Sequence, residues 1–490
     1  MSNGDVVLDI QNQEHLSTLT PANQNPTQEH VPTDEDCQTS LDQSLISTLQ
    51  NEIEKSTEEF DSRKKITKIQ WIPRIMKKEE FRDYYRQRAM KIGPLRPYSE
   101  DKLKLKLAAQ YIRNSDKTSN ELLVSIKKEI ETLSTCFHNE VLKYNEVHDV
   151  GTDSYNRWLR YLARMLLVDG CSILQFIYCR VWDKLKELQI DNGQASMIEQ
   201  DLFLMQNQIP FQVLEILMDQ LPRVGAFSRT VLQKSIDNFI GMNLMTPENV
   251  LKRSYLDFFK EKHPVHLLDI LRSGLLYGFD TSNIGRSRDR RSRDPSSKND
   301  SNREYFCNIQ QLKAAGIKME SSGTSCLGDV TFTSFGWFRA RLKLPPLIVN
   351  DATGRKLWNL IAYEMCPENY NSDYGVTSYV SLLDSLIDNE EDVKELRSAR
   401  ILRNQLSTDK EVVELFNEIG YNTVSDQAYH QVKQRIQRHC DSLWPTTQFL
   451  IVQFKQEYFR NPWSFIALLG SIAVLALTAT QTYFTINPTK

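Results

Sequence analysis

The residue types best suited to chemistry in this chain are few and widely spaced. Asp169 and Cys171 stand together in an apolar run, and Asn207 stands shortly before Pro210. A carboxylate beside a thiol can serve a nucleophilic enzyme. An apolar environment, however, raises the pKa of a thiol and demands a partner for a buried carboxylate. We therefore interpret Cys171 as a small core residue and Asp169 as a structural carboxylate paired with Arg164 or another basic residue.

The chain also lacks the usual motifs of metal and cofactor sites. Its eight histidines include one close pair, His263 and His266, without a third ligand at metal-site spacing. Its eight cysteines form no CxxC pair, which argues against a zinc site and a disulfide framework. No Gly-rich phosphate loop, GxSxG elbow, kinase motif set or HExxH is present. We expect no cofactor, no metal and no enzymatic activity; the alternative is an enzyme with an unrecognised site near Asp169, Cys171 and Asn207.

Charge is unevenly distributed over the 490 residues. The formal net charge is −3, but residues 1–62 contain thirteen acidic residues and a single basic one, Lys55. Such a segment buries too little apolar surface to offset the entropy of ordering, so it is predicted to be a disordered acidic tail. A second polar segment, 281–303, is rich in Arg and Ser and is predicted to be a surface loop. It has no aromatic stacking platform, so we expect no nucleic-acid partner.

Helical periodicity dominates the rest of the chain. Apolar residues recur at three- and four-residue steps over 119–142, and a run over 154–187 is apolar on nearly all sides, as in a buried helix. A further helix over 198–221 should break at Pro210, because proline lacks the amide donor. Later, glycines separate short stretches of strand-type residues. We expect a mainly α fold with a small antiparallel β element at about 316–349.

The last apolar segment, 463–484, contains no charged residue and would form a helix about 33 Å long. That length crosses a hydrocarbon core of about 30 Å, with Trp463 and Tyr483 at the two interfaces. A single C-terminal transmembrane helix is therefore predicted. Most flanking basic residues precede it, which places the bulk of the chain in the cytosol beside a membrane such as the plasma membrane. Ala467 and Ser471 have the small-xxx-small spacing that allows a weak homo-oligomer.

Several different short motifs follow one another along the chain. They are Ile92-Gly93-Pro94, Asp169-Gly170-Cys171, Asn207-Gln208-Ile209-Pro210, His266-Leu267-Leu268-Asp269, Leu344-Pro345-Pro346-Leu347, Asn359-Leu360-Ile361-Ala362-Tyr363-Glu364 and Asn461-Pro462-Trp463. Together they resemble the plant family called domain of unknown function 247, over about 69–485. We interpret these motif residues as structural: Gly93, Pro94, Asp169, Gly170, Cys171, Asn207, Gln208, Pro210, Pro345, Pro346, Asn359 and Glu364.

The resemblance implies a plant protein with a largely helical domain and a C-terminal membrane anchor, but no known reaction. Some grass members of the family are linked to self-incompatibility as recognition determinants. We expect a non-enzymatic recognition or signalling component that binds protein partners and contacts a lipid bilayer, with self-incompatibility as the narrower hypothesis. The predicted segments are the acidic tail (1–62), the first part of the family domain (63–280), the polar loop (281–303), an α+β second part (304–460), the transmembrane helix (463–484) and a short tail (485–490).

Overall fold

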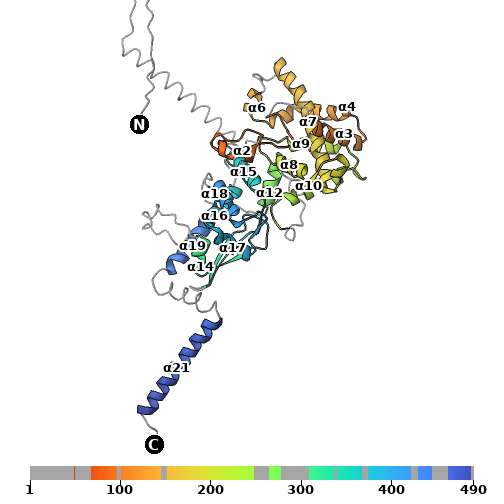
Figure 1. Cartoon of the computed structure of the whole chain (residues 1–490). Coiled ribbons are helices and arrows are strands. Elements are labelled where there is room, and N and C mark those ends of the chain that lie inside the picture. Colours follow the sequence, from red (N-terminus) through yellow and green to blue (C-terminus); the bar gives the residue numbers. More distant parts are fainter. Residues whose placement is uncertain are drawn as a thin grey trace, which may run out of the picture. The chain divides into compact units, whose positions relative to one another are not determined.

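The computed structural model describes residue 49 and residues 68–95, 101–144, 152–247, 264–277, 308–335, 339–366, 374–420, 429–443 and 462–486 (Figure 1). Three predicted segments lie almost wholly outside these residues: the acidic tail, the Arg/Ser-rich loop and the last residues. Contacts within the chain divide it into two units, Met1–Lys65 and Ile66–Lys490. The helices and strands named below belong to the second unit.

The first half of that unit, residues 68–247, is helical. In chain order its elements are η1 (Arg74–Met76), η2 (Glu79–Phe81), α2 (Arg82–Tyr85), α3 (Lys102–Asn114), α4 (Ser119–Lys128), α5 (Ile130–Thr135), α6 (Asn139–Tyr144), α7 (Asp153–Val181), η3 (Leu185–Leu188), α8 (Asn192–Asp201), α9 (Phe211–Asp219) and α10 (Arg229–Asn243).

Helix α7 is the centre of this half, because its residues from Met165 to Cys179 are almost all buried. Thr152 caps its first turn by accepting a hydrogen bond from the Tyr155 amide. Helices α3, α4, α9 and α10 all pack against it (Figure 1). The predicted run over 154–187 is therefore confirmed as a buried helix, although the helix ends at Val181.

The stretch predicted as one helix over 119–142 is divided into α4, α5 and α6. The backbone leaves helical geometry at Glu129 and resumes at Ile130. Both α4 and α5 pack against α7. The three- and four-residue spacing of apolar residues continues across the break, because both helices bury their apolar side chains on the side of α7. The periodic pattern thus reported burial correctly and continuity wrongly.

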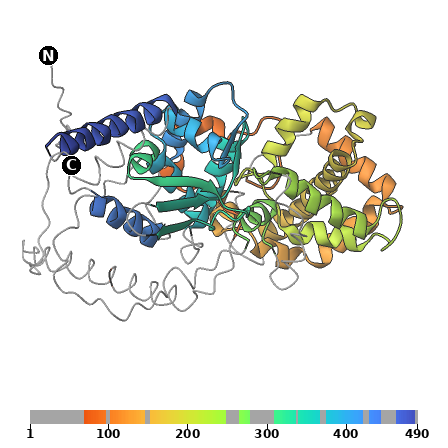
Figure 2. The ribbon, with the colours of Figure 1, turned by 90° about the horizontal axis from the view of Figure 1, so that it is seen from below.

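The second half, residues 264–443, combines helices with short strands. Its elements are α12 (Leu267–Leu275), α14 (Ile309–Ala314), β1 (Ile317–Ser321), β2 (Thr331–Phe335), β3 (Arg339–Leu344), β4 (Leu347–Val349), α15 (Thr353–Glu364), α16 (Gly375–Leu386), α17 (Glu390–Ser398), β5 (Leu402–Asn404), α18 (Asp409–Gly420) and α19 (His430–Leu443). Helix α14 packs beside β1 and α19 beside β2 (Figure 2).

The predicted antiparallel β element is wrong in its strand directions. Strand β3 is central in a three-stranded sheet, antiparallel to β2 but parallel to β1. Strand β4 forms a second sheet by pairing in parallel with β5, which lies outside the predicted range of 316–349. Alternation of apolar side chains marks a strand but carries no information about its neighbour's direction, because tertiary connections set that direction.

The predicted transmembrane helix is also corrected. A helix, α21, forms over Pro462–Ile486, but its described apolar part, Leu469–Thr482, is short for a membrane span. Among the described residues, the helix long and apolar enough to cross a membrane by length and composition is α7, and 89% of its most apolar stretch is buried inside the protein. The single C-terminal transmembrane helix is therefore wrong, since the long apolar helix is an internal core helix. Trp463 and Tyr483 fall within α21, but their side chains are outside the described part of the chain.

Gly170 lies on α7 where α9 packs against it. A Cβ at this position would stand 2.6 Å from Leu217 Cδ1 and 3.0 Å from Val213 Cγ1, so these side chains or the two helices would have to shift. We predict that Gly170→Ala lowers the free energy of unfolding by about 1–3 kcal/mol, the usual cost of overpacking a core. Chemical denaturation followed by circular dichroism measures this loss.

Gly323→Ala is the matched control for this substitution. Gly323 is exposed, and a Cβ there would meet no atom within 4 Å. Its free energy of unfolding should stay within about 1 kcal/mol of that of the native chain. An equal loss in both variants would contradict the close approach of α7 and α9.

Candidate functional site

The motif residues of the first half gather around an irregular segment, residues 87–93, which belongs to no helix or sheet. Asp201, the last residue of α8, is fully buried beside it. Its carboxylate accepts hydrogen bonds from three consecutive backbone amides: Arg88 at 3.0 Å, Ala89 at 2.6 Å and Met90 at 3.0 Å. A carboxylate with several amide donors replaces the partners that a sheet would have supplied.

Asn207 continues this arrangement along the same segment. Its Oδ1 accepts from the Ile92 amide at 2.7 Å and from the side chain of Gln87. Its Nδ2 donates to the carbonyl of Met90 at 3.0 Å and to that of Asp201 at 2.8 Å. The Asn207 side chain therefore supplies hydrogen-bond partners for backbone groups of both residues 87–93 and the turn after α8.

Asp169 completes the group from α7. Its Oδ2 accepts from the Gly93 amide at 2.8 Å, and its Oδ1 lies 2.7 Å from the Lys104 ammonium. Lys104 also donates to the carbonyl of Lys91 at 2.9 Å. Burial raises the pKa of Asp169, while the Lys104 charge and the Gly93 amide act in the opposite direction. We call the side chains of Asp169, Asp201 and Asn207 the polar clamp.

Gly93 brings two of the sequence motifs into direct contact. Its φ of +76° is left-handed, and a Cβ there would stand 2.4 Å from the Gln208 carbonyl oxygen. The Gln208 side chain donates to the carbonyls of Leu202 and Leu204, both at 2.8 Å. These bonds serve the non-helical turn that leads into Pro210, the residue before α9.

Helix α15 links the clamp to the second half of the domain. Arg355 places its guanidinium 3.4 Å from Asp201 and also donates to Gln200 at 3.1 Å and to the Arg86 carbonyl. One turn later, Asn359 accepts from the Met205 amide at 2.9 Å and donates to the Tyr84 carbonyl at 2.9 Å. The buried side chains of α15 thus hold the end of α2, just before residues 87–93, and the turn that follows α8.

Glu364, the last residue of α15, forms a second buried polar group. Its carboxylate lies 2.7 Å from Arg272 Nε on α12. It also accepts from the Val376 amide at 3.1 Å, the Thr377 amide at 2.8 Å and the Thr377 hydroxyl at 2.6 Å. Arg272 and the start of α16 are therefore joined through one carboxylate.

Pro345 and Pro346 are buried between β3 and β4, where the Pro345 carbonyl accepts from the hydroxyl of Tyr379 at 3.1 Å.

The residues considered for catalysis lie in the interior rather than at a surface. Asp169 and Cys171 are 0% exposed and Asn207 is 1% exposed. Burial raises the pKa of the Cys171 thiol well above its usual range, so the thiol stays protonated. Asp169 pairs with Lys104, whereas Arg164, the partner suggested by the sequence, is exposed. Within the described residues, no group of three or more His, Cys, Asp or Glu is placed to hold a metal ion.

Sequence reasoning missed three charged residues of this interior. Lys104 lies in an alternation of lysines and leucines over 102–107, and the pattern does not tell which lysine is buried. Asp201 gives one signal, because an uninterrupted apolar run follows it. Arg355 gives none, since its partners are far away in the sequence.

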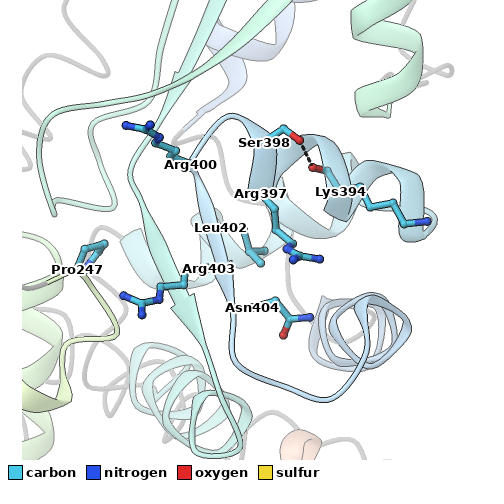
Figure 3. A pocket seen from close by; sticks show the side chains of 8 residues that line it. All are labelled: Pro247, Lys394, Arg397, Ser398, Arg400, Leu402, Arg403 and Asn404. Carbon is cyan, nitrogen blue, oxygen red and sulfur yellow. Dashed lines mark hydrogen bonds between the residues drawn. The ribbon is translucent and has the colours of Figure 1, made fainter.

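The described surface has a pocket of about 630 Å³ with a basic lining, formed by the C-terminal half of α17, the turn after it and β5 (Figure 3). Its lining residues are Pro247, Lys394, Arg397, Ser398, Arg400, Leu402, Arg403 and Asn404. Half of them are cationic and none is acidic. A second pocket, of about 450 Å³ between α3, α7 and η3, is lined mainly by neutral polar side chains, with Lys184 and Glu187 balancing in charge.

Comparisons with known proteins match most of the chain. A family model described as DUF247, plant protein of unknown function, matches residues 69–477. "UPF0481 protein At3g47200" of Arabidopsis thaliana is 23% identical over 422 residues, which cover 81% of this chain and 82% of that protein. "Putative UPF0481 protein At3g02645" of the same plant is 25% identical over 177 residues, 36% of this chain and 32% of that protein. No solved structure matches the chain.

His266 is held neutral in the interior at the start of α12. Its Nδ1 accepts from the Asp269 amide at 3.1 Å, and its ring packs edge-on to Tyr363. Burial lowers the pKa of His266 to about 4, although the Asp269 carboxylate acts in the opposite direction. A histidine whose pKa is depressed by folding stabilises the native state only above its unfolded pKa of about 6.5.

We therefore predict that about 3 kcal/mol of the free energy of unfolding is lost through His266 as the pH falls from about 6.5 to about 4. Denaturation at a series of pH values measures this loss. His266→Asn is the control, because asparagine retains a helix-capping acceptor but does not titrate. The difference in stability between the two proteins should narrow with falling pH; a constant difference would mean that His266 is already protonated or accessible.

Proposed function

The chain belongs to the DUF247 family of plant proteins of unknown function, and we propose that it is a non-enzymatic protein that binds protein partners and attaches to a lipid bilayer. A role in recognition or signalling is the narrower form of this proposal. Self-incompatibility is narrower still and rests on the family resemblance alone.

The use of the motif side chains carries the non-enzymatic part of the proposal. Asp169, Asn207, Asn359 and Glu364 are buried, and each binds backbone or side-chain groups from other segments. A catalytic group must touch a substrate, and these groups are already occupied by the protein's own chain. This supports a fold whose motif chemistry is structural and whose function resides on its surface.

The character of α21 supports attachment to lipid. Its described apolar side chains are well exposed, and the helix contains no charged residue. The hydroxyls of Thr478, Thr480 and Thr482 donate to the carbonyls four residues earlier, at 2.8, 2.7 and 2.8 Å. Such bonds satisfy the hydroxyls without water, which suits an apolar surrounding. Exposed apolar surface on this scale is unfavourable in water, and lipid contact would remove the cost.

Liposome flotation of the full-length protein tests the attachment. Ile472 and Leu475 are 53% and 69% exposed on α21, and lysine at both positions places two charges on its apolar surface. Each substitution removes an apolar side chain whose burial against lipid is worth about 1.5–3 kcal/mol. We therefore predict that Ile472→Lys with Leu475→Lys reduces the floating fraction at least about tenfold.

The matched control places the same charges elsewhere. Ile75 and Val224 are 71% and 87% exposed outside α21, so Ile75→Lys with Val224→Lys should float like the native chain. Flotation that survives the α21 substitutions, or that the control substitutions also abolish, would rule out attachment through α21.

Partner binding is tested with the full-length chain as bait in plant tissue, using Cys171→Ala as a second bait. Cys171 is a buried thiol in the packing of α7, so its removal leaves the surface unchanged. We predict that quantitative mass spectrometry recovers the same specific proteins with both baits. Recovery of no specific protein contradicts the proposal. A folded Cys171→Ala protein that captures its partners but has lost its biological effect would instead favour the enzyme alternative.

A further inference from the structure

The pocket formed by the C-terminal half of α17, the turn after it and β5 has basic but no acidic residues in its lining. Arg397, Arg400 and Arg403 line it together with Lys394, and no acidic residue does. Arg397 already binds Asp409 through two hydrogen bonds of 2.8 and 2.9 Å, and Lys394 lies 3.3 Å from Glu391. Arg400 and Arg403 are both exposed, and no side-chain hydrogen bond or ion pair engages either of them among the described residues. Two guanidinium groups without a partner in the described part of the chain therefore line the pocket.

Arg400 occupies a left-handed backbone position, where glycine would be favoured. Its φ is +58°, and its amide donates to the Arg397 carbonyl at 3.0 Å while the Ile401 amide donates to the Leu396 carbonyl at 2.9 Å. This is the hydrogen-bond pattern of a Schellman helix end, whose left-handed residue is usually glycine. An arginine there costs about 1 kcal/mol relative to glycine, so helix termination alone does not explain it.

Electrostatics of the helix end explain only part of the cluster. A basic side chain in the last turn of a helix is stabilised by the helix dipole, and Arg397 stands in the last turn of α17. Arg403 stands in β5, beyond the reach of that effect. In Figure 3, Arg400 and Arg403 extend to the side of Pro247, whereas Arg397 and Asn404 extend to the opposite side. The arginine side chains thus extend to two opposite sides of the pocket lining rather than along one helix.

We propose that this pocket binds a small ligand carrying more than one phosphate group. Its volume of about 630 Å³ lies within the range of small-molecule sites. Guanidinium forks bind phosphate oxygens in pairs, and a tetrahedral phosphate offers enough oxygens for two arginines at once. Phosphate groups at both sides of the ligand match arginines at both sides of the pocket. Such a ligand is either a free polyphosphorylated compound or the headgroup of a phosphorylated inositol lipid, which share this chemistry.

The test uses the full-length protein and two probes. Inositol hexakisphosphate in isothermal titration calorimetry represents the free ligand. Phosphatidylcholine vesicles with and without phosphatidylinositol 4,5-bisphosphate represent the lipid. We expect saturable binding of at least one probe, weakening as salt is raised. Binding of hexakisphosphate assigns a soluble ligand, and a preference for bisphosphate vesicles without such binding assigns a lipid headgroup.

Arg400→Gly with Arg403→Gln separates binding from folding. Glycine suits the left-handed position, so thermal unfolding should be unchanged or shifted upward. The double variant should weaken binding of the responding probe at least about tenfold, because two charge-assisted bonds are lost. In vesicle assays both proteins keep α21, so any attachment through that helix is the same and only the bisphosphate-dependent increment is compared.

Lys318→Gln with Lys410→Gln is the charge-matched control. These lysines are 73% and 69% exposed and lie outside the pocket lining, and the pair removes the same net charge. Its affinity should change less than about twofold. An equal weakening in both double variants would mean non-specific attraction to a basic surface, and binding of neither probe would mean an unoccupied basic surface; either result overturns the proposal.

Discussion

A partly buried segment of irregular backbone must find hydrogen-bond partners for its amides, and this requirement organises the first half of the domain. Residues 87–93 lie in no helix or sheet, so their amides have no ladder to enter. An amide buried without a partner costs as much as a lost hydrogen bond. Asp201, Asn207 and Asp169 supply the acceptors, each from a different place in the chain. The packing of α3, α7, α8 and the turn before α9 is consequently tied to one short segment.

The same acceptors bring charge into the core, and every buried charge then requires its own compensation. Asp169 meets Lys104, Asp201 meets Arg355, and Glu364 meets Arg272. Ion pairs of this kind return little net stability, because desolvation offsets their attraction, but leaving one partner alone is costly. We infer that they act on specificity, because each pair favours one placement of two elements: α3 on α7, α8 on α15, and α12 on α15. This explains why the motif residues are spread over the chain and yet meet in space.

Local properties of the structure were readable from the sequence. The helix at α7 and its burial follow from composition, and the start of α9 after Pro210 follows from the geometry of proline. The helix predicted over 198–221 was otherwise wrong, because α8 already ends at Asp201 and residues 202–210 are not helical. The need of Asp169 for a basic partner was also readable, but the partner was not. Lys104 is one of three lysines that alternate with leucines at the start of α3. Which of them meets Asp169 depends on how α3 packs against α7, and the sequence does not give that orientation. The directions of the strands could not be predicted for a similar reason, because β1 and β3 become parallel through the path of the chain between them.

By itself, then, the sequence determined that the domain is mainly helical, that the apolar run at α7 is interior and which family the motifs belong to. These depend on local propensity, periodicity and residue identity. The tertiary structure alone decided the directions of the strands, what the motif side chains bind, and that Arg397, Arg400 and Arg403 line one pocket. Those outcomes depend on distances between residues far apart in the chain, and such distances exist only after desolvation and packing have selected one arrangement.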